Sequence, residues 1–445
     1  MSEPGALRAG VARVVITPPL GVPMAGFGNR AQPSQSVHDD LTATALVLDD
    51  GATRLGVLSL DLLALHDWQV AAVRERAASA VGLPADNLLV SLTHTHSGPL
   101  TWLGRGHDGL VGAYLENLTN QLVGVLAWAA REAGPARLGF GRGEVQIQVN
   151  RREKRSDGTT VIGVNREGAV DREVGVLRLD GEDGGPIAAL VNYACHPVIL
   201  GPLSYALSAD FVGRTRRVFE SAVGARCLFL QGCTGDLNPI GGVTDRYDNC
   251  ERLGAILAGE VLKTHGQIEV GPPRAPLAAR RRQFDLPLQP LDPVGEIERE
   301  IAEARDRLAK AQAEGEPALF VERERFLFER AERVLAEARA DRTQAAVPFE
   351  VQALRLGEVG LVAAPAELFV EIGLRIKRRS PFPATMTLGY ANGCVGYVPV
   401  AEAYPDGGYE VDRAHKGYGA LAAVAPTAAG LIENTAIELL GELAR

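Results

Sequence analysis

Short apolar segments that alternate with turn residues and helical segments constrain the fold of this chain most. Between residues 9 and 65, strand-length apolar runs at 11–16, 41–48 and 55–60 are separated by Gly, Pro and Asp. A helical spacing of apolar residues follows at 68–81, and the alternation of strands with helices continues to about residue 265 and resumes at residue 349. The pattern predicts an α/β fold, with a mixed β-sheet core flanked by helices.

Residues 293–342 differ in composition from the rest of the chain. They are rich in Glu, Arg, Ala and Leu, and their apolar residues recur at helical spacing. The sequence Glu314-Gly315-Glu316-Pro317 interrupts this pattern as the turn between two helices would. We therefore expect an inserted, charged helical hairpin. A solvated packing arm, a dimer contact and an active-site lid are all compatible with it.

Charge and cysteine usage exclude several classes of protein. The 46 Lys and Arg residues against 55 Asp and Glu residues give a net charge of −9, which argues against a nucleic-acid partner. No apolar run approaches the ~18 residues that span a bilayer, and residues 1–13 lack the apolar segment of a secretory signal. The five cysteines show no CxxC spacing, which favours reduced thiols. We expect a cytoplasmic protein without a stable membrane anchor.

Two histidines follow a strand-like run in Thr93-His94-Thr95-His96-Ser97-Gly98-Pro99. On an extended strand, residues i and i+2 point to the same face, so His94 and His96 could reach one centre. Imidazoles at a strand end can begin a zinc site or place a base beside a metal. The alternative is a pair of histidines that only hydrogen bond to backbone carbonyls.

A second strand-like run ends at Ala194-Cys195-His196-Pro197 and delivers another histidine. Downstream, Asp210 could orient a ligating imidazole or could cap the helix that follows. A Cys–His nucleophile at Cys195 and His196 is disfavoured, because neighbours on a strand point to opposite faces.

Three later segments carry further candidates. The stretch 228–239 runs from a strand into a Gly-rich loop that could hold an anion, although such clusters are usually turns. Pro365-Ala366-Glu367 is expected to open a helix, in which Glu367 could simply complement the helix dipole. Tyr397 and Tyr409 belong to a cluster of tyrosines beside glycines, which is typical either of a cleft or of the rim of a core.

Taken in order, these motifs resemble the catalytic domain of the neutral/alkaline non-lysosomal ceramidases. The resemblance rests on the following segments: Gly10-Val11-Ala12, Ile16-Thr17, Met24-Ala25-Gly26-Phe27, 93–99, Tyr397 and Tyr418-Gly419. It covers most of the chain apart from the charged insert. It implies one ceramidase-like catalytic domain over residues 1–445, interrupted by the hairpin at 293–342.

The resemblance also implies a role for each site residue. It assigns one zinc ion per chain to four ligands: His94, His196, Glu367 and Tyr397. It makes His96 the general acid or base, Tyr409 a donor to the oxyanion, and Arg151 an arginine beside the site. Zinc lowers the pKa of a bound water to about 7 and polarises a carbonyl, so this set fits a hydrolase that cleaves C–N amide bonds through a metal-activated water.

Some features depart from the family pattern. The family's Gly-Asp-x-Ser-Pro is Gly235-Asp236-Leu237-Asn238-Pro239 here, so a serine nucleophile at that position is excluded. The sequence ends at Arg445 without an immunoglobulin-like domain. We therefore expect an N-acyl amine or another small amide as substrate rather than ceramide.

Two other functions remain alternatives. A TIM-barrel amidohydrolase also begins with His-x-His, but it needs further metal ligands at later strand ends, and His265 lies in a polar turn. A non-catalytic assembly protein would use the histidines as a structural metal site and the 293–342 hairpin as an interface between copies.

Overall fold

The computed structural model describes residues 6–101, 109–340, 342 and 345–445. Its largest element is an eight-stranded sheet. In spatial order the strands are β12 (Arg226–Gln231), β10 (Pro186–Tyr193), β9 (Glu173–Gly181), β6 (Gly134–Glu144), β1 (Arg8–Val15), β3 (Thr42–Asp49), β4 (Arg54–Leu60) and β5 (Leu88–Leu92). The two outermost pairs, β10–β12 and β4–β5, are parallel, whereas the inner pairs are antiparallel. The sheet is therefore mixed, as the sequence predicts.

The two parallel edges of this sheet meet. The Ser59 hydroxyl of β4 donates a hydrogen bond to the Phe229 carbonyl of β12 over 2.7 Å. Because parallel neighbours end at the same side of a sheet, the segments that follow β5, β10 and β12 emerge close together. This curling of the sheet brings the histidine motifs at 93–96 and 194–197 to one place.

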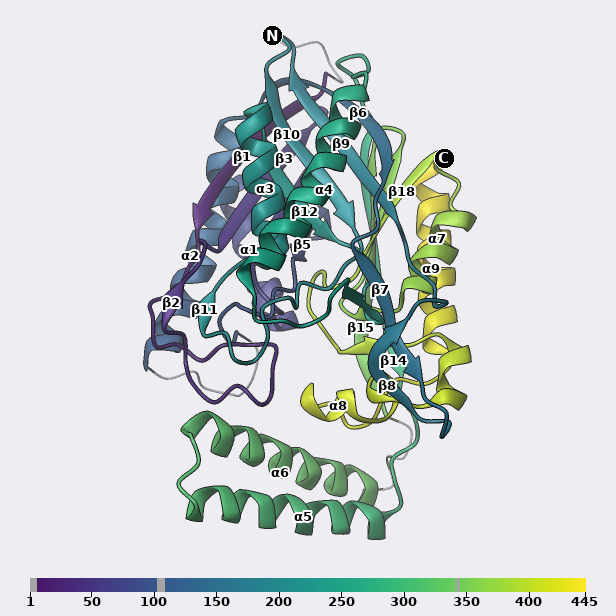
Figure 1. The fold of residues 1–445 in the computed structure, drawn as a ribbon. Coiled ribbons are helices and arrows are strands. Elements are labelled where there is room, and N and C mark those ends of the chain that lie inside the picture. The colour runs from purple at the N-terminus through teal and green to yellow at the C-terminus, as the bar shows by residue number, and fades with distance from the viewer. Residues whose placement is uncertain (1–5, 102–108, 341, 343–344) are drawn as a thin grey trace.

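A second, four-stranded sheet packs against the first and completes four layers (Figure 1). Its order is β14 (Leu277–Pro287), β15 (Ala346–Leu356), β16 (Val359–Ala363) and β18 (Ala384–Leu388). Leucines and valines of both sheets form the core between them. The outer face of the large sheet is covered by α1 (Asp67–Val81), α2 (Gly109–Arg131), α3 (Asp210–Val223) and α4 (Tyr247–Gln267), and that of the small sheet by α7 (Val370–Arg379) and α9 (Ala428–Ala444).

Short strands shape the region around the meeting edges. They are β2 (Ser36–Val37) with β11 (Ala206–Leu207), β7 (Gln148–Lys154) with β8 (Thr160–Asn165) and β13 (Leu237–Pro239), and β17 (Glu367–Leu368) with β19 (Tyr397–Val398). In the last pair, Glu367 lies directly opposite Tyr397. The expectation that Glu367 opens a helix is therefore wrong: α7 begins at Val370, and Glu367 belongs to a strand.

Helices α5 (Val294–Ala313) and α6 (Ala318–Arg339) form an antiparallel pair between β14 and β15. A small apolar cluster holds them together: Ile297, Ile301, Ala331 and Val334. Figure 1 shows α6 facing the body of the protein and α5 on the outer side. The pair occupies the segment 293–342, of which position 341 lies outside the described residues.

The remaining helical elements are short. They are η1 (Ala85–Asn87), η2 (Ala401–Asp406), the π-helical turn η3 (Tyr409–Arg413) and α8 (Ala414–Gly417). Among the residues described, no helix is both long and apolar enough to cross a bilayer. The mixed strand order rules out the TIM-barrel alternative, which requires a closed parallel sheet.

Candidate active site

Three imidazoles converge where the two edges of the large sheet meet. His96 Nε2 lies 3.4 Å from His94 Nε2 and 3.0 Å from His196 Nε2. His94 and His196 are fully buried, and no other group of three or more metal-binding side chains occurs in the described part of the chain. The sequence motifs at 93–96 and 194–197, which are 100 residues apart, thus supply one cluster.

The backbone that presents His94 differs from the expected extended strand. Strand β5 ends at Leu92, and His94 has a φ of +64°, in the left-handed region. The convergence of His94 and His96 therefore comes from a turn after the strand, and the expectation that strand pleating aligns them is wrong. Gly26 provides the space for this turn: a Cβ at its φ of +99° would lie 2.5 Å from the His96 ring.

Hydrogen bonds fix the tautomers of two of the three rings. His94 Nδ1 lies 2.8 Å from the Leu63 carbonyl oxygen, and His196 Nδ1 lies 3.3 Å from that of Thr234. Because a carbonyl only accepts, each Nδ1 carries the proton and each Nε2 presents its lone pair to the cluster. Burial lowers the pKa of His94 to about 3 and those of His96 and His196 well below the ordinary value. All three rings are therefore neutral at physiological pH.

The Glu367 carboxylate completes the cluster. Its Oε2 lies 3.5 Å from His94 Nε2 and 4.0 Å from His196 Nε2. Burial raises the pKa of Glu367 to about 7, whereas hydrogen bonds from phenols, that of Tyr418 foremost, act in the opposite direction. Tyr390 donates to Oε2 over 3.2 Å, and Tyr418 donates to Oε1. The carboxylate is thus held in place by two tyrosines.

Arg151 and Tyr397 lie beside this carboxylate. Arg151 Nη2 donates to the Tyr397 hydroxyl over 3.0 Å, and its Nε donates to Glu410 over 2.8 Å. Glu410 also pairs with Arg152 at 2.8 Å, so one buried carboxylate holds two arginines. Burial raises the pKa of Tyr397 well above its ordinary value, so the phenol keeps its proton.

Tyr409, the first residue of η3, packs against Tyr397. The two ring centroids are 5.7 Å apart in an edge-to-face arrangement. Burial raises the pKa of Tyr409 as well. All seven residues expected at the site from the sequence are therefore brought into one region by the fold: His94, His96, Arg151, His196, Glu367, Tyr397 and Tyr409.

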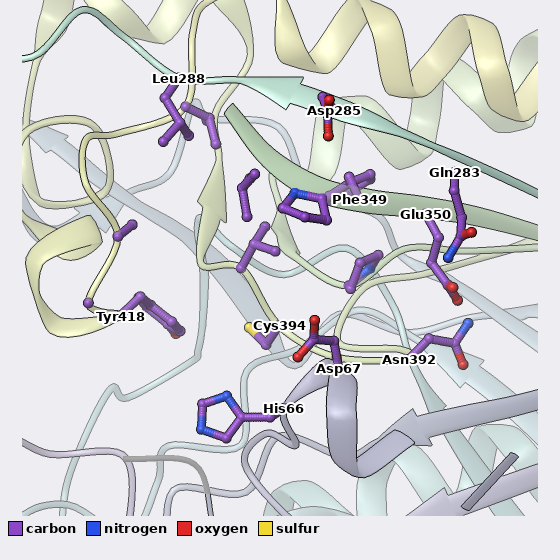
Figure 2. Close-up of a pocket in the computed structure, with 18 of the residues that line it drawn as sticks. His66, Asp67, Gln283, Asp285, Leu288, Phe349, Glu350, Asn392, Cys394 and Tyr418 are labelled. Atoms are coloured by element: carbon purple, nitrogen blue, oxygen red, sulfur yellow. The ribbon is translucent and has the colours of Figure 1, made fainter. Parts of the chain in front are cut away.

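A cavity of about 780 Å³ lies beside this region, and of the seven residues only Tyr397 is part of its lining. Its wall includes Tyr397, Tyr418 and Glu410, and it continues past apolar side chains such as Phe349 and Leu288. Figure 2 shows Tyr418 on one side of the cavity and Glu350 on the opposite side, with Cys394 between them. The cavity is large enough for a substrate with an apolar portion.

The comparisons with known proteins fit this geometry. A protein family described as neutral/alkaline non-lysosomal ceramidase, N-terminal, matches residues 7–245, which include all three histidines and Arg151. That match covers more than half of the chain. The chain belongs to this family.

Curated relatives support the assignment. A neutral ceramidase of Pseudomonas aeruginosa is 24% identical over 91% of this chain and 68% of its own length. Neutral ceramidase B of Dictyostelium discoideum is 25% identical over 49% of this chain and 33% of its own length. Membership in this family makes the chain an amide hydrolase, and the alternative of a non-catalytic assembly protein is set aside.

Solved structures show the same fold. A structure described as ceramidase complexed with C2 superposes with a TM-score of 0.72 at 21% identity, over 99% of this chain and 75% of that one. The neutral ceramidase from Pseudomonas aeruginosa gives a TM-score of 0.70 at 20% identity, with the same coverage. The predicted α/β architecture and the family resemblance are both confirmed.

Two candidate residues from the sequence analysis, Asp210 and Cys195, take no part in the cluster of three imidazoles and Glu367. The Asp210 carboxylate accepts hydrogen bonds from the backbone N–H groups of Leu200 and Phe211, so the idea that it orients an imidazole is wrong. Backbone carbonyls, not carboxylates, hold the Nδ1 atoms of His94 and His196. Cys195 is fully buried, and burial raises the pKa of its thiol well above the ordinary value, which agrees with its exclusion as a nucleophile.

Three residues at the site were missed from the sequence. Glu410 and Tyr390 are buried, Tyr418 is half-buried, and all three contact Arg151 or Glu367. Tyr418 entered the sequence analysis only as part of a family motif, and none of the three was assigned a role at the site. Glu410 has no sequence signal, because a lone acidic residue in a loop is common. The clustering of tyrosines near residues 390–418 was the available signal for the two phenols.

Proposed function

We propose that this chain is a zinc-dependent hydrolase that cleaves the C–N bond of N-acyl amines. The observation that carries the proposal is the convergence of His94 Nε2, His196 Nε2 and a Glu367 oxygen, with contacts of 3.5 and 4.0 Å between the nitrogens and the carboxylate. Two lone pairs and a carboxylate that face one another repel unless a proton or a cation lies between them. A proton on Glu367, whose pKa burial raises to about 7, could serve only one of the two nitrogens, whereas a cation would satisfy both lone pairs and the carboxylate together.

The donor set fits zinc. Imidazole nitrogen and carboxylate oxygen are ordinary zinc ligands, and the Nδ1 hydrogen bonds to Leu63 and Thr234 are the outer contacts that orient such ligands. His94, His196 and Glu367 would hold the ion, with Tyr397 as a fourth ligand. A bound zinc ion supplies a water ligand of lowered pKa and polarises the substrate carbonyl.

The remaining residues would handle protons and charge. His96 is neutral and has its Nε2 within 3.4 Å of both neighbouring imidazoles, so it is placed to accept a proton and pass it to the departing amine. The phenol of Tyr409 keeps its proton and can donate a hydrogen bond to a developing oxyanion. Arg151 contributes a fixed positive charge beside Tyr397.

The substrate class follows from the relatives and the cavity together. The named relatives are ceramidases, so their substrate is a lipid amide. The cavity of about 780 Å³ offers apolar side chains for an acyl portion next to Tyr418. We propose an N-acyl amine with an apolar acyl chain, which is larger than the small amide expected from the sequence alone. A cytoplasmic location remains part of the proposal.

Replacing the histidines tests the metal and the activity together. We expect His94→Ala and His196→Ala to lose bound zinc and turnover of N-acyl amine substrates, measured by metal analysis of the purified proteins and by amine release. Asn238→Ala should keep its zinc, because Asn238 contacts Arg151 at 3.5 Å and not the cluster.

His38→Ala is the matched control. His38 is partly exposed, lies against Tyr247 and pairs with Glu251, so its loss should change neither zinc content nor turnover. Stoichiometric zinc in the His94→Ala protein would contradict the proposal.

A further inference from the structure

Helix α6 is tied to the loop that carries Tyr418. We call residues 415–421, which comprise the end of α8 and the turn that follows it, the Tyr418 loop. Arg330 of α6 is 3% exposed, and it donates hydrogen bonds of 2.8 Å to the carbonyl oxygens of both Ala420 and Leu421. A buried guanidinium that binds two adjacent carbonyls fixes the course of that backbone.

Further contacts strengthen this connection between the hairpin and the loop. Glu300 of α5 accepts from Arg330 over 3.0 Å and pairs with Lys416 over 3.0 Å, so both helices hold the loop. The Phe326 ring lies so close to Gly419 that a Cβ there would be 2.8 Å from it. The loop therefore has little freedom to shift away from α6.

The same loop reaches the metal cluster through one side chain. The Tyr418 hydroxyl donates to Glu367 Oε1, and its ring lies edge-on to that of Tyr397 at 6.1 Å. Only Gly419 separates Tyr418 from Ala420, whose carbonyl Arg330 binds. Displacement of the loop would move the phenol and leave the buried Glu367 carboxylate without one of its donors.

Helix α6 also approaches a second segment beside the site. A Cβ on Gly28 would lie 3.1 Å from Arg323 Nε. The neighbouring Phe27 ring meets the His96 ring at 5.0 Å, edge to face. The hairpin thus touches both segments whose aromatic side chains flank the cluster. This placement goes beyond a solvated packing arm.

We propose that Arg330 is a positioning residue for the metal site: it holds the Tyr418 loop so that Tyr418 can orient Glu367. This inference rests on the proposed metal site at His94, His196 and Glu367. It gives the charged hairpin a supporting role at the active site, although none of its described residues touches the cluster itself. Partners that orient a metal ligand typically contribute 10- to 100-fold to metal affinity.

The test is a double-mutant cycle on zinc affinity, measured by competition with a chromogenic chelator on the full-length protein. We expect Tyr418→Phe to weaken zinc binding about 10- to 100-fold. Arg330→Met, which keeps the aliphatic stem and removes the donors, should weaken it by about tenfold, within that range. The double variant should be no weaker than Tyr418→Phe alone, because both changes act through one contact.

Control variants separate positioning from general stability. Arg339→Met is the matched control: Arg339 lies on the same helix, is exposed and pairs with Glu298 of α5, so zinc affinity should not change. Arg330→Lys keeps a cation that can reach the carbonyls and should retain more affinity than Arg330→Met. It also serves if the methionine variant does not fold.

The outcomes distinguish this inference from the proposed function. Additive losses in the cycle, or unchanged zinc affinity in folded Arg330→Met and Arg330→Lys, would overturn the role of Arg330 alone. A wild-type protein that binds no zinc would overturn the proposed function, and this inference with it. If the Arg330 variants bind zinc more weakly but the wild-type protein hydrolyses no N-acyl amine, the positioning role of Arg330 would be supported and only the proposed activity would be overturned.

Discussion

Gln231 donates a hydrogen bond from its side-chain amide to the Thr93 carbonyl over 3.0 Å, directly before His94. The same nitrogen donates to the Cys195 carbonyl over 2.9 Å, directly before His196. One fully buried side chain at the end of β12 therefore joins the two segments that carry the histidines. The spacing between His94 and His196 depends on this link across the two edges of the large sheet.

We predict that Gln231→Met weakens zinc binding about 10- to 100-fold, because the two histidine segments lose their common donor. Two buried carbonyls would also lose a partner, which should lower the free energy of unfolding by roughly 2–4 kcal/mol. Chelator competition and urea unfolding measure the two effects.

The control for this variant is Gln352→Met. Gln352 is equally buried, and its amide donates to the carbonyls of Asp86 and Leu88, away from the cluster. It should show a similar loss of stability with normal zinc affinity. If both variants affected zinc binding equally, the link through Gln231 would have no special role.

The buried carboxyl of Asp210 predicts a specific pH dependence of stability. Burial raises its pKa to about 6, whereas the unfolded chain has a value near 3.9. As the pH rises from about 4 to about 6, the unfolded state releases this proton before the folded state does, so the free energy of unfolding falls. The full loss from this one group is about 3 kcal/mol.

Asp210→Asn should remove this contribution, and asparagine tolerates the φ of +55° at this position. Urea unfolding of both proteins from pH 4 to pH 7 gives the difference in stability between them. The substitution also changes the free energy of unfolding by an amount that does not depend on pH. This amount cancels when only the change of stability with pH is compared between the two proteins. A wild-type minus variant difference that stays flat over this range would show that Asp210 ionises normally in the folded protein.

Glu410 is predicted to support activity without holding the metal. Glu410→Gln would leave Arg151 and Arg152 without their shared buried carboxylate, at a cost of about 3 kcal/mol in the free energy of unfolding. We expect zinc content to remain stoichiometric and kcat to fall, because Arg151 loses the contact that fixes it beside Tyr397. Metal analysis, steady-state kinetics and urea unfolding separate the three effects.

Glu220→Gln provides the comparison. Glu220 also lies between two arginines, Arg13 and Arg226, and neither belongs to the site. Its loss should lower stability and leave kcat unchanged. Loss of zinc from the Glu410→Gln protein would assign Glu410 to the metal site instead.

The sequence predicts the layers of this fold better than the contacts of its site. Apolar runs and helical spacing are local features, and they identified the mixed α/β core. The closeness of residues 94 and 196 follows from the curling of the sheet, which no local pattern records. The left-handed φ of His94 and the short strand around Glu367 depend on partners far away in the sequence, such as Tyr397 across β17 and β19.

Buried side chains that donate hydrogen bonds to carbonyls far away in the sequence were the hardest features to predict. Gln231 lies in a segment that resembles an ordinary turn, and its role appears only when Thr93 and Cys195 are placed beside it. In the same way, Arg330 belongs to a helix whose sequence is typical of a solvated surface. Buried polar side chains that bind distant carbonyls leave no periodic pattern in a sequence.

Tyr409→Phe should lower kcat by about 10²- to 10³-fold, the usual effect of removing one donor to an oxyanion. Its ring packs on Tyr397, and phenylalanine keeps that packing, so zinc content and stability should stay close to those of the wild type. Because burial raises the pKa of the phenol, it remains a donor through neutral and mildly alkaline pH. The factor by which kcat falls should therefore be the same at pH 7 and pH 9.

Tyr404→Phe is the control. The Tyr404 hydroxyl donates to the Val424 carbonyl over 2.8 Å, so its removal should affect stability but not kcat. Steady-state kinetics at both pH values measure this, and an unchanged kcat in Tyr409→Phe would remove Tyr409 from the reaction.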